Sequence, residues 1–128
     1  MPFSANPLSE AVIPIMELAP VIPVIRIDDP ANAVPLARAL VAGGLRVLEV
    51  TLRTEHGLGA IRAMAEAVPD AVSGAGTVLD PAQLRSLRGT GCPVVVSPGA
   101  TEELLDAAPD VGIPLLPAAC TPTEVLSL

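Results

Sequence analysis

One pattern recurs five times along this chain of 128 residues and limits the folds that it can adopt. Each repeat has an apolar run, a polar turn and then a helix start, and the apolar runs are VIPVIRI (21–27), LRVLEVTL (45–52), AVSGAGTV (71–78), PVVVS (93–97) and IPLLP (113–117). The runs lie roughly 20 to 25 residues apart, which is the spacing of a strand plus a crossover helix. The pattern therefore predicts consecutive βα units with parallel strands.

Helix signals lie between the apolar runs. Apolar residues recur at helical spacing over 33–41 and again over 58–68. Asp80, which is followed by proline, and Thr121, which begins a TPTE capping box, are expected to be helix N-caps. We also expect a short N-terminal helix within 4–18.

Parallel βα units lead to a doubly wound sheet or to a closed eight-stranded barrel. Polar or special residues gather where each run passes to its helix, and barrels build their active sites at that rim, so we favour the barrel. A complete barrel needs about 200 residues or more. We therefore expect an α/β fold that is the N-terminal part of one (β/α)8 barrel domain, 1–128, with a helical segment at 1–20, about five βα units at 21–128, and no closure.

Composition excludes several classes of function. Hydrophobic residues make up 51% of the chain and one residue is aromatic, so the core must be built from small aliphatic side chains. The net charge is -7, which argues against nucleic acid as a partner because phosphate backbones require clustered cations. No apolar run is long enough to cross a membrane and the first residues lack a signal peptide, so we expect a cytoplasmic protein without membrane contact.

Two further absences bear on chemistry. The single histidine, His56, and the two cysteines, Cys92 and Cys120, form no metal-ligand pattern, so we expect no metal and no cofactor. We expect His56 to be solvated and the cysteines to be free, buried thiols. All seven basic residues are arginine, so the chain contains no lysine.

The second apolar run carries polar residues at alternate positions. Side chains of a strand alternate between its two faces, so Glu49, Thr51 and Arg53 are expected to share one face. On an ordinary half-exposed strand that face would meet water, whereas in a catalytic barrel it would point inward. A guanidinium binds a carboxylate through two parallel N–H bonds, and a carboxylate beside a cation can accept a proton, so the set suits acid–base chemistry on an acidic substrate.

The motifs LEVTLRT, GAGTV, SPG and LPAACTPTE stand in an order and spacing that resemble one known family, with a match that runs from Val21 to the end of the chain. The family is the bacterial 2-keto-3-deoxy-6-phosphogluconate (KDPG) aldolase, also called 4-hydroxy-2-oxoglutarate (KHG) aldolase. The resemblance implies a (β/α)8 barrel, a homotrimer, and reversible cleavage of the keto acid to pyruvate and glyceraldehyde 3-phosphate through a lysine Schiff base. It also implies a place in the Entner-Doudoroff pathway.

The resemblance assigns roles to four residues of this chain. It implies that Glu49 is the catalytic proton carrier and that Arg53 holds the pyruvate carboxylate. It further implies that Thr77 donates a hydrogen bond to that carboxylate and that Pro98 lines the pyruvate methyl group. The alternatives are structural: an ion pair at the rim for Glu49 with Arg53, a strand end for Thr77, and a turn for Pro98.

The departures from the family concern the nucleophile and the phosphate site. The family's Schiff base lysine lies on the strand after the TPTE helix and its phosphate site lies on the last strands, and neither is in this sequence. Ala118 also replaces a common glycine. We therefore expect an incomplete, inactive portion of an aldolase. The alternatives are a non-catalytic half-barrel that assembles through its open strand edges, and another phosphate-sugar barrel such as an epimerase or thiamin phosphate synthase.

Overall fold

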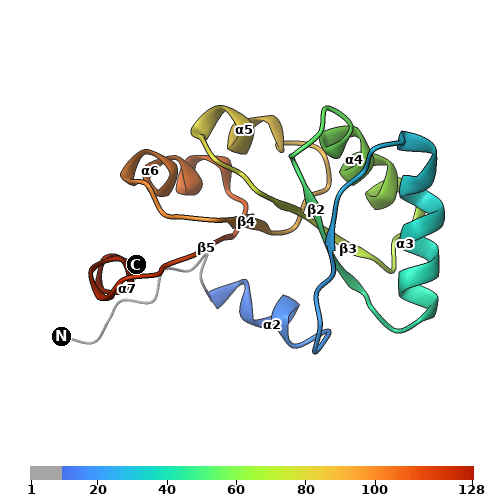
Figure 1. Ribbon diagram of the computed structural model, residues 1–128, viewed down its shortest axis with the longest axis horizontal. Helices are drawn as coiled ribbons and strands as arrows, with labels where there is room; N and C mark the ends of the chain where they lie inside the picture. Colours follow the sequence, from blue (N-terminus) through green and yellow to red (C-terminus); the bar gives the residue numbers. More distant parts are fainter. Residues whose placement is uncertain (1–9) are drawn as a thin grey trace.

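The computed structural model describes residues 10–128, which contain one sheet of five parallel strands in the order β1-β2-β3-β4-β5 (Figure 1). The strands are β1 (Val24–Ile25), β2 (Val47–Thr51), β3 (Val72–Gly76), β4 (Val95–Ser97) and β5 (Leu115–Pro117). All five predicted strands are confirmed. Each crossover places a strand next to its predecessor without reversal, which is the order of a barrel rather than of a doubly wound sheet. The barrel is not closed within the described residues, because β1 and β5 are edges.

Six helices and a 3₁₀ turn complete the described part of the chain. They are α2 (Ile13–Met16), η1 (Pro30–Asn32), α3 (Ala33–Ala42), α4 (Gly57–Ala67), α5 (Pro81–Ser86), α6 (Glu102–Val111) and α7 (Pro122–Ser127). Of the helix predicted over 4–18, the described part is the single turn α2, and residues 4–9 lie outside the described range. Within 10–128 no helix combines the length and the apolar character that crossing a membrane requires.

Side-chain caps begin the later helices where the sequence predicts them. The Asp80 carboxylate accepts a hydrogen bond from the Gln83 backbone N–H at 2.8 Å. Thr121 and Glu124 form the reciprocal bonds of a capping box at the start of α7. These bonds satisfy backbone donors that have no partner within a helix, so each strand passes to its helix at a defined residue.

The two faces of the sheet have different neighbours. Figure 1 shows α3 to α6 on one side of the strands and α2 on the other. Alternate strand residues, among them Leu48, Val50 and Val95, join side chains of these helices in the main core. The opposite face is apolar but only partly covered: Val24 of β1 is 59% exposed and Leu116 of β5 is 36% exposed.

Both cysteines are free thiols. Cys92 is buried, its Sγ lies 3.2 Å from the Val94 carbonyl oxygen, and burial raises the pKa of this thiol to about 11. Cys120 is exposed, so the expectation of a buried thiol is wrong there. Its position between the edge strand β5 and α7 leaves it without cover.

Two buried serines on the helix-facing side of the sheet give a test of this packing. The Ser73 hydroxyl is buried without a hydrogen-bond partner, whereas the Ser97 hydroxyl donates to the Gly99 carbonyl oxygen at 2.6 Å. We expect Ser73→Ala to leave the free energy of unfolding unchanged or to raise it by about 1 kcal/mol, because it removes an unpaired polar group. Ser97→Ala should lower it by about 1 kcal/mol. Denaturant unfolding measures both, and equal losses would contradict the assignment of Ser73 as unpaired.

Candidate active site

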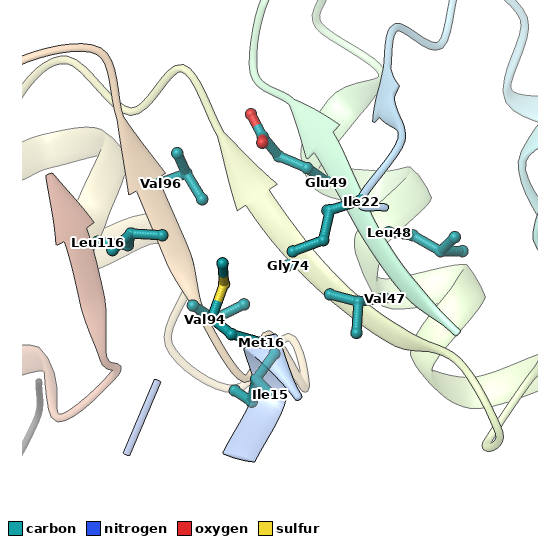
Figure 2. Close-up of a pocket in the computed structure, with 10 residues that line it drawn as sticks. All are labelled: Ile15, Met16, Ile22, Val47, Leu48, Glu49, Gly74, Val94, Val96 and Leu116. Atoms are coloured by element: carbon teal, nitrogen blue, oxygen red, sulfur yellow. The ribbon is translucent and has the colours of Figure 1, made fainter. Parts of the chain in front are cut away.

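A groove of about 210 Å³ follows the partly covered face of the sheet. Its lining residues are Ile15, Met16, Ile22, Val47, Leu48, Glu49, Gly74, Val94, Val96 and Leu116. Figure 2 shows Ile15 and Met16 at one end of the groove and the Glu49 carboxylate toward the arrowheads of β2 and β3. Among the lining residues in the described range 10–128, Glu49 is the only ionisable one, and it lies near the end where barrels place catalytic groups.

The Glu49 carboxyl has a perturbed acidity. Burial raises its pKa, and the nearby positive charge of Arg53 opposes that rise without cancelling it. Desolvation destabilises the charged form, so this carboxyl holds a proton at a higher pH than an exposed glutamate does. A group with this property and access to a groove is suited to accept and return a proton.

Arg53 lies in the turn that follows β2. The strand ends at Thr51, so alternation along β2 does not reach Arg53, and a shared face for Arg53 and Glu49 stays a prediction. The side chain of Arg53 is exposed, and the ion pairs among residues 10–128 do not include one between it and Glu49. Its guanidinium therefore acts on Glu49 as a nearby charge and not as an ion-pair partner.

Thr51 and Thr54 attach the end of β2 and the turn after it to β1 and to the segment that follows β1. The buried Thr51 hydroxyl donates to the Ile25 carbonyl oxygen at 3.0 Å, and the Thr54 hydroxyl donates to the Ile27 carbonyl oxygen at 2.6 Å. These bonds hold the strand end and the turn that carries Arg53. Sequence reasoning left Thr51 without a role, because its partner lies on β1 and is recognisable only once β1 and β2 are known to pair.

Thr77 has an unusual backbone conformation. Its φ is 57°, in the left-handed region that β-branched residues rarely occupy, and it is half-buried directly after β3. Strain of this kind persists where the surrounding structure holds it, and it is common at functional sites. The Thr77 side chain therefore leaves the backbone in a different direction from the one it would take if β3 continued through residue 77.

Pro98 belongs to a different hollow. It is exposed after β4 and lines a space of about 280 Å³ with Val78, Leu79, Gly99, Thr101 and Leu104. Glu49 lies within β2, whereas Arg53, Thr77 and Pro98 follow the carboxyl ends of β2, β3 and β4, and of these four residues Glu49 alone lines the groove. The roles of Arg53, Thr77 and Pro98 stay predictions.

The remaining chemical groups are few. Within residues 10–128 no set of three or more His, Cys, Asp or Glu side chains is arranged to hold a metal ion. His56 is partly exposed at the start of α4, with its Nε2 atom 3.8 Å from Glu55 Oε1.

Comparison with known proteins decides which family this arrangement represents. The sequence profile described as KDPG and KHG aldolase matches residues 12–127. The chain belongs to the KDPG and KHG aldolase family. The KHG/KDPG aldolase of Escherichia coli K12 is 53% identical over 112 residues, which are 88% of this chain and 53% of that protein. The chain thus spans about half the length of the curated relatives it matches.

Two solved structures of aldolases resemble this family member closely. One is the KDPG aldolase of Zymomonas mobilis ZM4 with 3-phosphoglycerate, with a TM-score of 0.87 and 48% identity over 92% of this chain and 56% of that one. The other is the Legionella pneumophila enzyme with pyruvate captured as a covalent carbinolamine, with a TM-score of 0.84 and 42% identity over 88% of this chain and 55% of that one. The five-stranded sheet therefore corresponds to part of an aldolase barrel.

The backbone of Thr77 gives one testable prediction for this aldolase family member. Thr77→Gly should raise the free energy of unfolding by about 1 kcal/mol, because glycine adopts a positive φ without steric cost. Thr77→Ala is the matched control and should give no such gain, since alanine keeps a Cβ atom. Denaturant unfolding of both variants measures the difference, and equal stability of the two would contradict the strain at Thr77.

The acidity of Glu49 gives a second prediction, with Glu124 as its internal control. Hydrogen bonds from the backbone N–H groups of Cys120 and Thr121 lower the pKa of Glu124, opposite to the shift at Glu49. Carbon-13 NMR titration should place the two pKa values on opposite sides of 4.5. Similar values for both would contradict the burial of Glu49.

The same shift has a consequence for stability. The folded state binds the Glu49 proton more tightly than the unfolded state, so the contribution of this group to stability falls as pH rises from about 4.5 through its raised pKa. Glu49→Gln should abolish that part of the pH dependence, which unfolding at several pH values measures.

Proposed function

We propose that this chain supplies the keto-acid side of an aldolase site, as the N-terminal portion, 1–128, of a single barrel domain. The reaction is the reversible cleavage of 2-keto-3-deoxy-6-phosphogluconate to pyruvate and glyceraldehyde 3-phosphate, and of 4-hydroxy-2-oxoglutarate by the same chemistry. The observation that carries the proposal is the half-buried Glu49 carboxyl, which has a raised pKa and lines the groove on the sheet of a chain that belongs to the aldolase family.

The chemistry requires an amine and a proton carrier. The amine adds to the ketone and loses water to form an imine, and the hydroxyl proton two carbons away is then removed. The carbon–carbon bond breaks with its electron pair drawn toward the imine, and the resulting enamine is protonated before water releases pyruvate. The chain has no lysine, so the amine must come from outside these 128 residues. The covalent carbinolamine of the Legionella relative supports this route.

Glu49 is the proton carrier in this proposal. Its raised pKa brings proton binding closer to neutral pH, where acid–base catalysis is most effective, and the groove gives a water molecule or substrate access to it. The exposed guanidinium of Arg53 binds the substrate carboxylate, Thr77 donates a hydrogen bond to that carboxylate, and Pro98 contacts the methyl end of pyruvate. Glu49 acts on the substrate, and the other three residues hold it.

The cellular setting follows from the same assignment. The partners are a small keto acid and a sugar phosphate, the assembly is a homotrimer, and the reaction belongs to the Entner-Doudoroff pathway of carbohydrate metabolism in the cytoplasm. The arginine after β2 favours the gluconate-derived substrate over its galactonate-derived isomer.

A second candidate is a non-catalytic half-barrel that assembles through its edges. It is favoured by the exposure of Val24 on β1 and Leu116 on β5, which are the edge strands of the sheet within residues 10–128. Sedimentation distinguishes the candidates, since a well-folded monomer at micromolar concentration argues against assembly through these edges.

Reconstitution tests the aldolase proposal. The chain is mixed with a polypeptide carrying the C-terminal half of the Escherichia coli relative, and pyruvate and borohydride are added before mass spectrometry. We expect the adduct on the added polypeptide and none on a side chain of this one. Cleavage of KDPG by the mixture should fall about 100-fold with Glu49→Gln, because proton transfer is lost.

Glu55→Gln is the matched control, because Glu55 lies exposed in the turn after β2. It should leave the rate of cleavage unchanged. Cleavage by this chain alone, or equal rates for the two variants, would contradict the proposal.

A further inference from the structure

On the face of the sheet that the groove follows, here called the inner face, the two β3 residues nearest to Glu49 are glycines. Gly74 lies directly across from Glu49 in the parallel register, and Gly76 follows two residues later on the same face. Neither glycine is among those with a positive φ, so the backbone conformation does not explain their presence. The explanation must lie in the space that a Cβ atom would occupy.

That space differs for the two glycines. A Cβ on Gly74 would lie 2.6 Å from Val94 Cγ1 and 2.9 Å from the Val94 carbonyl oxygen. A Cβ on Gly76 would instead overlap the carboxylate oxygen Oε1 of Glu49 and lie 2.6 Å from its Cγ and 2.7 Å from its Cδ. Glu49 therefore lies against the bare backbone of Gly76.

The backbone at Gly76 cannot move away easily. Its carbonyl oxygen accepts a hydrogen bond from Leu52 N–H at 2.8 Å, and the preceding residue, Ala75, donates to the Val94 carbonyl oxygen at 3.0 Å. β3 is thus held from both sides. A methyl group at position 76 would have to be accommodated by Glu49, and because the overlap reaches Cγ, that side chain would have to change its χ1 rotamer.

We propose that Gly76 is a positioning residue that keeps the Glu49 carboxyl folded against β3 at the end of the groove. The catalytic meaning of that position rests on the proposed function, whereas the contact itself does not. A Cβ atom at position 76 would take the space that the Glu49 carboxyl occupies.

The raised acidity of Glu49 depends on the same contact. Burial is the larger cause of the shift in its pKa, and displacement of the carboxyl from β3 reduces that burial. The pKa should then return toward 4.5. A residue that merely stabilised the sheet would not move it.

A double-mutant cycle tests the proposal on the 128-residue chain, without any assay of catalysis. Gly76→Ala is made in the wild-type chain and in Glu49→Ala, and denaturant unfolding gives the equilibrium constant of each. We expect Gly76→Ala to raise the unfolding constant about ten-fold in the wild-type chain but less than about two-fold when Glu49 is alanine. Carbon-13 titration should show a lower pKa for Glu49 in the Gly76→Ala variant than in the wild-type chain.

Gly74→Ala is the matched control and should destabilise the two backgrounds equally, because its Cβ would meet Val94 and not Glu49. Failure of Gly76→Ala to fold in the wild-type chain alone supports the proposal. Failure in both backgrounds, equal losses in both, or an unchanged pKa of Glu49 overturns it. If the reconstituted mixture does not cleave KDPG but the double-mutant cycle gives the expected result, the proposed function is rejected and the positioning of Glu49 by Gly76 still holds.

Discussion

The pairing of β2 with β3 is the constraint on which the candidate site depends. Five residue pairs join these strands in parallel, from Val47 with Val72 to Thr51 with Gly76, the longest register in the sheet. Paired residues of parallel strands point to the same side, so one register sends Leu48 into the helix-covered core and Glu49 into the groove. A slip of one residue would exchange those faces and bury the carboxyl among helices, which makes the register a condition of the candidate site.

Local sequence was sufficient to locate the elements. Each predicted strand is an apolar run bounded by turn residues, and the caps at Asp80 and Thr121 act on N–H groups a few residues away, so all the information lies within short segments. The length of β1 was the weaker prediction: 21–27 was expected and Val24–Ile25 is observed. Within residues 10–128 this strand is an edge of the sheet, and it is preceded by Pro23, which has no N–H to donate to the ladder.

The site required information that no short segment contains. Glu49 was identified by its type and by alternation along one strand, but the hydroxyl bond from Thr51 to Ile25 joins two strands across 26 positions. The φ of Thr77 runs against the preference of a β-branched residue, so propensity points away from it. Arg53 was placed on the face of Glu49 by extending alternation past the point where the strand ends. The Thr51 bond depends on which strands pair, the Thr77 backbone departs from local propensity, and β2 ends before it reaches Arg53.

The acidity of Glu49 and the open edges of the sheet have a common cause. The inner face is covered at one end by α2 and is otherwise apolar, so the carboxyl is only partly removed from water, and its pKa is raised by that partial burial. Further strands added beyond β1 and β5 would enclose the same face, because a barrel interior is filled by side chains from all its strands. Enclosure would remove more water from Glu49 and would also strengthen the attraction between the Glu49 carboxylate and the Arg53 guanidinium. Both the desolvation and this attraction grow as the local dielectric constant falls. The cation after β2 thus limits how far burial can neutralise the carboxyl, and the balance between these two effects sets the pH range in which Glu49 can exchange a proton.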